Sequence, residues 1–140
     1  MTTLTDNSAL CLMVAEETFV IVLKPGNPSK STIELATSTL DVALALVSTK
    51  HCVILDTTRL AASKVLPMMP KMLQALYDMS DVNLLLGVVV TSASAVVAAC
   101  KVAKSVAPSD KREQFHISKT YEDALAAVEI AREGSKLTPG

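Results

Sequence analysis

A run of almost wholly aliphatic residues, from Leu84 to Val90, constrains this chain more than any other segment. Such a run is typical of a β-strand that is covered on both faces of its sheet. Thr91 and Ser92 end the run, and apolar residues then recur three or four positions apart, at Val96, Ala99, Ala103 and Val106. That spacing predicts the buried stripe of a helix. A buried strand that leads directly into an amphipathic helix is half of a βαβ unit, so we expect an α/β fold.

The other segments extend this unit into a single domain with the element order β-β-α-β-α-β-α-β-α. Strands are predicted at 9–14, 18–23, 52–55, 84–90 and 114–117, and the first two suggest a β-hairpin although no glycine marks their turn. We expect a mixed, mostly parallel five-stranded sheet with four helices, in which the first strand runs antiparallel to the second and right-handed crossovers add the others. The domain is expected at 9–132, between a flexible lead at 1–8 and a flexible tail at 133–140.

The composition narrows the class of protein. Half of the 140 residues are hydrophobic, yet the apolar runs fall far short of the roughly 20 residues that cross a bilayer. Residues 1–8 are polar and lack the pattern of a signal peptide. A net charge of −1 gives no basic footprint for nucleic acid, and three cysteines without CxxC spacing are expected to be reduced packing residues. We therefore expect a cytoplasmic protein that neither inserts into a membrane nor binds nucleic acid.

Two polar segments follow predicted parallel strands, where α/β proteins place their ligand sites. Asp56 ends one strand and is a candidate ligand residue, or it caps the turn into Thr57 and Thr58 through its carboxylate. Thr91 and Ser92 stand at a helix N-terminus, which is an intrinsic anion site. Because the glycines and the lysine of a P-loop are absent there, ordinary N-capping is the simpler interpretation of this segment.

No catalytic or metal-binding constellation appears in the sequence. His51 and His116 are its two histidines, and neither has a Cys, Asp or Glu at a metal-ligand spacing. A nucleophile-elbow motif is also absent. We therefore predict no enzymatic activity, no metal and no cofactor, and rank an enzyme that works through Asp56 third among the hypotheses. Four methionines crowd one predicted helix, where they either fill an aromatic-poor core or line an apolar pocket: Met68, Met69, Met72 and Met79.

Three segments carry a resemblance to a known family. They are the strand from His51 to Asp56, the strand from Gly87 to Thr91 with its helix, and the closing strand Gln114–Ile117 with the helix that starts at Tyr121. On these segments the chain resembles the STAS-like domains, which include the anti-sigma-factor-antagonist proteins and their SpoIIAA-like relatives. The resemblance implies a non-enzymatic regulatory domain that binds other proteins.

The resemblance also implies a phosphoacceptor. Regulatory STAS domains carry a phosphorylated serine in an Asp-Ser-Ser-Gly type of segment after the corresponding strand. Here that stretch runs from Thr57 to Ser63 and contains no glycine. Ser63 lies where the phosphoacceptor is expected, near the start of a helix predicted at Pro67, and Thr57 and Thr58 are the alternatives.

The leading hypothesis is therefore a STAS-like regulatory or protein-interaction module, with a carrier of small apolar ligands or lipids as the alternative. The carrier would use a pocket beside 68–79. We also expect a homodimer, because the hairpin strands are apolar on both faces and helices gathered on one side would leave part of the sheet uncovered. Met13, Val20 and Val22 are the residues expected at the contact.

Overall fold

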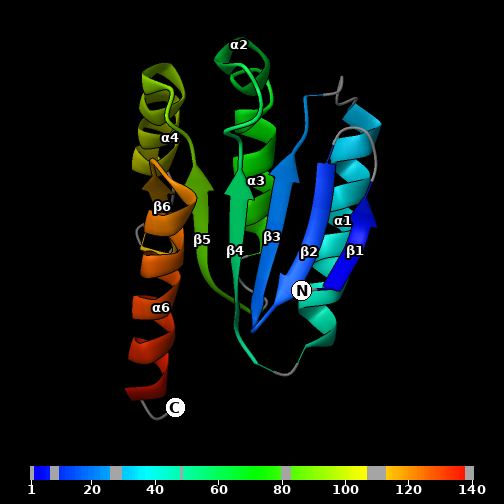
Figure 1. Cartoon of the computed structure of the whole chain (residues 1–140), viewed down its shortest axis with the longest axis vertical. Coiled ribbons are helices and arrows are strands. Elements are labelled where there is room, and N and C mark those ends of the chain that lie inside the picture. Colours follow the sequence, from blue (N-terminus) through cyan, green and yellow to red (C-terminus); the bar gives the residue numbers. More distant parts are fainter. Residues whose placement is uncertain are drawn as a thin grey trace.

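The computed structural model describes residues 2–6, 10–25, 30–47, 49–79, 83–106 and 113–137. Its elements are β1 (Thr2–Asp6), β2 (Leu10–Ala15), β3 (Thr18–Leu23), α1 (Lys30–Leu46), β4 (His51–Asp56), α2 (Ala62–Val65), α3 (Met69–Met79), β5 (Leu84–Val90), α4 (Ser94–Val106), β6 (Phe115–Ser118) and α6 (Tyr121–Leu137). One sheet forms the centre, with helices on both sides of it (Figure 1). The predicted α/β class is confirmed. None of the described helices is both long enough and apolar enough to cross a membrane.

The six strands of the described part lie in the sheet in the order in which they occur in the chain, with β1 and β6 at its edges. β2 is antiparallel to β1 and β3, whereas β3, β4, β5 and β6 are all parallel. The antiparallel hairpin, the parallel strands after it and the interior position of β5 agree with the prediction. The predicted count of five strands is one too low, because Thr2–Asp6 pairs with β2. This edge strand is mostly polar, so its sequence lacks the apolar run that identified the others.

The helices also differ from the four expected, since the described residues form five. The segment before β5 folds into the short helix α2 and the regular helix α3, and α3 begins at Met69 with Pro70 in its first turn. Proline is tolerated there because the first helical N–H groups have no partner in the helix. Helix α6 continues to Leu137, well into the expected tail. Residues 138–140, and residues 1 and 7–9 near the expected lead, lie outside the described part.

The described helices that connect the parallel strands cover one face of the sheet, here called the closed face (Leu12, Phe19, Ile21, Val53, Leu55 and Val89). From β3 to β6, each parallel strand is added on the same side of the one before it, and crossovers share one handedness. The helices that connect these strands therefore lie on the same face of the sheet. Helices α1, α3 and α4 accordingly share a buried cluster with these strands, through Leu40, Leu44, Met69, Met72, Leu73, Val96 and Cys100. In Figure 1 these helices lie behind the sheet. The main core of the protein is therefore on this side.

The opposite face, here called the half-open face (Cys11, Met13, Val20, Val22, Cys52, Ile54, Val88 and Val90), receives helix α6. This helix follows the last strand and packs on β4, β5 and β6 through Ala124 and Val128 (Figure 1). No other described helix packs on this face. The described residues leave it uncovered over β1, β2 and part of β3, where Cys11, Met13 and Val22 are partly exposed, whereas Val20 of β3 is buried. We call this part the open half (Cys11, Met13 and Val22).

Candidate functional site

The carboxyl end of β4 brings together three of the predicted site residues. The Asp56 carboxylate accepts hydrogen bonds from the Thr58 backbone N–H at 2.9 Å and from the Thr58 hydroxyl at 2.6 Å, which is a turn-capping arrangement. Thr57 is only 2% exposed, and its hydroxyl donates to the Val90 carbonyl at 2.7 Å. Both threonine hydroxyls are thus engaged in holding the turn between β4 and α2.

The second predicted segment lies at the carboxyl end of the neighbouring strand β5. Thr91 is buried, its backbone N–H donates to the Ser118 carbonyl, and its hydroxyl accepts from the Ala93 N–H at 3.3 Å. Ser92 is exposed. The Ser118 hydroxyl is buried, and the described residues offer it no hydrogen-bond partner. Thr91 therefore shapes the turn into α4, whereas Ser92 faces solvent.

The candidate phosphoacceptors differ in accessibility. Ser63 is exposed on α2 and Thr58 is exposed in the turn, whereas Thr57 is buried. A kinase would reach the Thr57 hydroxyl only after this edge of the sheet had opened. Among the three, Ser63 and Thr58 are the accessible side chains.

Two grooves border helix α6, and sequence reasoning did not identify them. The larger, of about 510 Å³, lies between α6 and the β2–β3 hairpin, and is lined by Ala15, Glu16, Thr18, Val20, Tyr121, Leu125, Val128, Glu129 and Arg132. The smaller, of about 390 Å³, lies on the other flank of α6, beside Leu86, His116 and Ile130. Val20, which lines the larger groove, is the cross-strand partner of Met13 in the open half, so the groove and the open half are neighbours on one face of the sheet.

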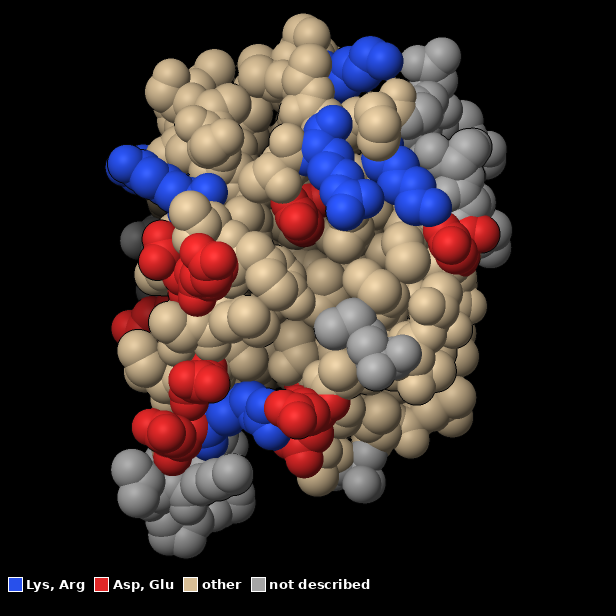
Figure 2. Space-filling view, in the orientation of Figure 1, with Lys and Arg blue, Asp and Glu red and all other residues tan. Residues whose placement is uncertain are grey.

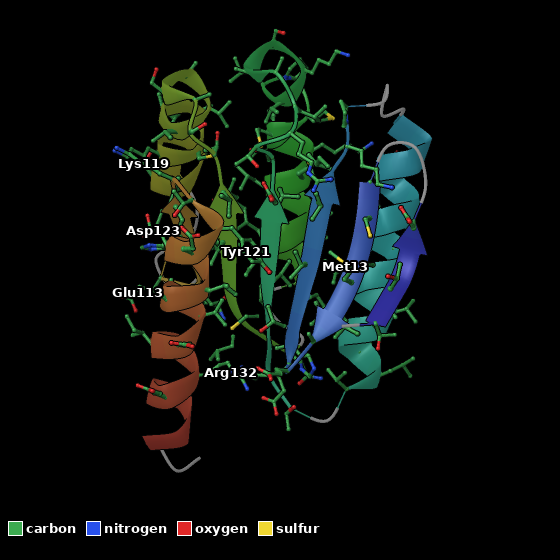
Figure 3. All side chains as sticks on the ribbon, viewed as in Figure 1. Met13, Glu113, Lys119, Tyr121, Asp123 and Arg132 are labelled. Carbon is green, nitrogen blue, oxygen red and sulfur yellow. The ribbon has the colours of Figure 1, made fainter. Side chains whose placement is uncertain are left out.

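Charged groups stand at one end of the larger groove, and a phenol stands at the other. Figure 3 shows Arg132 near the β2–β3 turn and Tyr121 near the start of α6. Glu16 and Glu129 accompany Arg132, so the carboxylates outnumber the guanidinium. Burial, and then the charge of Asp56, raises the pKa of Tyr121, so its phenol keeps its proton at neutral pH. This set of groups does not concentrate positive charge for an anion.

The turn of the β2–β3 hairpin is conformationally unusual. Glu16 and Glu17 both have positive φ, at 48° and 63°, and they link β2 to β3 as a two-residue turn. Hairpins of this kind are normally made by Asn-Gly, because side chains disfavour positive φ. Glu16 of this strained turn also lines the larger groove.

Several of the remaining sulfur and imidazole groups serve packing. Met69 and Met72 are buried in the core of the closed face, and Met68 packs against it; the Met79 side chain lies outside the described part. His51 is buried, with Nδ1 3.0 Å from the Thr49 carbonyl. The described cysteines are free, and burial raises the pKa of Cys52 to about 11 against the opposing effect of Arg132. No group of three or more potential metal ligands occurs among the residues described.

Comparisons with protein families, with curated proteins and with solved structures find no match to this chain. The candidate site is therefore assigned on the geometry alone. Its central feature is the open half with the adjoining groove. The apolar character of both strand faces was the sequence signal for this surface, whereas the groove beside α6 had no signal of its own.

Proposed function

We propose that this protein is a STAS-like interaction module that binds a protein chain through its open half and carries out no catalysis. One observation carries the proposal. Cys11, Met13 and Val22 are partly exposed on neighbouring strands of a sheet whose other side packs against helices. Figure 2 shows a wide uncharged surface on this side of the molecule. Uncovered apolar surface of this kind is typical of a protein contact.

The chemistry of the candidate reactive groups supports an interaction role over an enzymatic one. The Asp56 carboxylate is held by Thr58, and the Thr57 hydroxyl is held by Val90. The Cys52 thiol is fully buried, and its pKa of about 11 keeps it protonated, whereas nucleophilic cysteines are exposed thiolates. A general base beside a free nucleophile is not found among these groups.

Binding can be tested by capture from the source cell with a matched pair of variants. Met13→Lys places a charge in the open half, whereas Val102→Lys places the same charge on an outward position of α4 that is already 66% exposed. We expect a protein retained by the unaltered chain and by Val102→Lys to be lost from Met13→Lys. Equal retention by all three proteins would contradict binding through the open half.

Phosphorylation supplies the regulatory part of the proposal. Ser63 is exposed and lies beside Lys64, so a phosphate there would gain a neighbouring cation while adding roughly two negative charges to this edge. We expect mass spectrometry of protein from its native cell to find phosphate on Ser63 or Thr58. Repeated absence under several growth conditions would leave an unmodified interaction domain.

A carrier of small apolar ligands is the second candidate, and the groove beside α6 favours it. Its volume of about 510 Å³ falls in the range of roughly 300–1,000 Å³ that is usual for ligand sites. The pocket expected beside 68–79 does not support this function, because Met69 and Met72 are buried core residues. Native mass spectrometry of the purified protein separates the two candidates: a co-purifying small molecule supports the carrier, and an unliganded chain supports the interaction module.

A further inference from the structure

We propose that the groove between α6 and the β2–β3 hairpin binds a small amphiphilic cation, which is an apolar chain with an ammonium or related group at one end. This inference rests on the carrier function proposed for the groove, and it adds the chemical class of the ligand. It does not depend on protein binding at the open half. The argument comes from the length of the groove, its apolar floor and the charges at one of its ends.

The helical wall of the groove is one stripe of α6. Its members recur three or four positions apart, which places them on one side of the helix: Tyr121, Leu125, Val128 and Arg132. From Tyr121 to Arg132 this stripe is roughly 16 Å long, at about 1.5 Å per residue. An extended octyl chain is shorter than this stripe, so the groove accommodates an apolar chain lengthwise.

The middle of the groove is apolar on its helical side and on its strand side. Leu125 and Val128 line it from α6, and Val20 lines it from β3. Val20 and Val128 are buried and form a floor, whereas Leu125 is 39% exposed. A ligand chain that lies against Leu125 removes this apolar surface from water, so the chain supplies affinity. Selectivity among ligands then depends on the polar groups at the two ends.

Negative charge is in excess at the end of the groove beside the β2–β3 turn. Glu16 and Glu129 line the groove there together with one cation, Arg132. None of these three side chains forms an ion pair with a described residue. The two carboxylates are therefore open to a ligand, and Arg132 offsets the charge of only one of them.

Further exposed charges around this end keep the balance negative. Glu17 is the second residue of the turn, and Glu133 lies one helical turn beyond Glu129 on α6. Lys50 is a second described cation at this edge, since it lies two residues before Cys52, whose N–H donates to the Glu17 carbonyl. Figure 2 shows acidic side chains on both sides of a basic one at this end of the molecule. The carboxylates outnumber the described cations, which favours a cationic head group.

The other end of the groove is lined by an uncharged group, which fixes the direction of the ligand. Tyr121 lies there, at the opposite end from Arg132 (Figure 3). Its phenol keeps its proton at neutral pH, because burial, and then the charge of Asp56, raises its pKa. Asp56 itself does not line the groove, and its carboxylate accepts from Thr58. The ammonium head therefore lies at the β2–β3 turn, and the apolar chain points toward Tyr121.

Three probes with the same chain separate the effect of the head group from that of the tail. Octylammonium, octanoate and octanol share the octyl chain and differ in the charge of the head group. We expect isothermal titration calorimetry, below the concentrations at which the probes form micelles, to show octylammonium bound about tenfold more tightly than octanol, and octanoate more weakly than either. In NMR spectra of the full chain, the methyl signals of Leu125 and Val128 should shift with both octylammonium and octanol, which would locate the octyl chain in the groove.

Variants at the charged end test the recognition of the head group. Glu16→Gln with Glu129→Gln keeps the size of both side chains, and should lower the affinity for octylammonium to that for octanol. Arg132→Gln should have the opposite effect, because it removes the cation that offsets the carboxylates. The matched control, Asp41→Asn with Glu113→Gln, removes two exposed carboxylates that do not line the groove, and should leave the affinities for both probes unchanged. Circular dichroism checks that each variant is folded.

The possible failures of this inference can be told apart. Octanoate bound as tightly as octylammonium would overturn the cationic class of ligand, and so would a preference for octylammonium that persists in the variant with both Glu16→Gln and Glu129→Gln. If octanol still shifts the methyl signals of the groove in either case, the carrier function stands and only this inference fails. If none of the three probes binds, the carrier function fails together with the inference, and the interaction module at the open half is left.

Discussion

The two faces of the sheet are built from the same strands but are completed differently. On β3, Phe19, Ile21 and Leu23 point to the closed face, whereas Val20 and Val22 alternate with them toward the half-open face. Among the described helices, those that connect the parallel strands seal the first face, and α6 covers only part of the second. An apolar strand position is therefore not by itself a sign of the core. Whether a face of the sheet is covered therefore depends on where the chain places its helices, and not on the apolar character of the strand side chains.

The largest expected effect compares two adjacent residues of β2. Leu12 is fully buried in the closed face, and Met13 is partly exposed in the open half. We expect Leu12→Ala to lower the free energy of unfolding by about 3 kcal/mol, because it removes buried methyl groups and leaves a cavity. Met13→Ala should cost less than about 1 kcal/mol, since its side chain is already in contact with water. Urea denaturation of both variants at a low protein concentration measures the difference. Similar losses would show that the open half is covered within one chain.

The second prediction concerns how tightly the closed face is packed. A Cβ atom on Gly87 would lie 3.0 Å from Cδ1 and Cε1 of the Phe115 ring, and that ring stacks edge-on against Tyr77 with centroids 4.5 Å apart. We expect Gly87→Ala to cost about 2 kcal/mol, because the ring has little room to move. The matched control is Gly134→Ala, where nothing lies within 4 Å of the new Cβ. Thermal unfolding should show a lower Tm for Gly87→Ala and no loss for Gly134→Ala. An unchanged Tm in Gly87→Ala would mean that the closed face has room for an additional methyl group.

Much of this fold follows from the sequence, and the exceptions have physical causes. The run from Leu84 to Val90 and the helical stripe after it predicted the α/β class, because long aliphatic runs have few alternatives in a chain of this length. Strand β1 was missed because an edge strand is stabilised largely by backbone hydrogen bonds, and its side chains are mostly polar. Polar composition likewise suggested a tail after Arg132, although α6 continues to Leu137.

The candidate site was less predictable than the fold. The apolar residues at positions 13, 20 and 22 were expected on an uncovered face, but Val20 is only 2% exposed because α6 packs beside it. The groove lined by Glu16, Tyr121 and Arg132 joins residues that are more than 100 positions apart in the chain. No local pattern marks such a groove, since it depends on which face receives the last helix.

The third prediction tests whether the part of the half-open face under α6 excludes water as well as the closed face does. Burial raises the pKa of Cys52 from 9.0 to about 11, so the folded protein holds this proton in a range where the unfolded chain releases it. Stability is therefore full below pH 9 and falls as the pH rises toward about 11, by an amount on the order of 1–2 kcal/mol. Tyr77 and Tyr121, whose pKa burial also raises, add to the loss above pH 10.

Denaturant titrations at pH 8 and pH 10.5 measure this loss. Cys52→Ala should reduce the pH dependence, whereas Cys11→Ala, a matched thiol variant in the open half, should leave it in place. An unchanged pH dependence in Cys52→Ala would show that water reaches the strands beneath α6, and the contrast between the covered and uncovered parts of this face would then fail.

The smallest effect is expected at the hairpin turn, where the open half meets the larger groove. Glu16 and Glu17 hold positive φ without being glycine, and relief of this strain should stabilise the fold. We expect Asn and Gly at these two positions, in that order, to raise the free energy of unfolding by about 1 kcal/mol. Glu16→Gln with Glu17→Gln removes the same charges but keeps both side chains in the strained conformation, so it should give no such gain. An equal gain in both double variants would assign the effect to repulsion between the carboxylates. A gain only with Asn-Gly would show that the effect comes from the backbone strain at the turn.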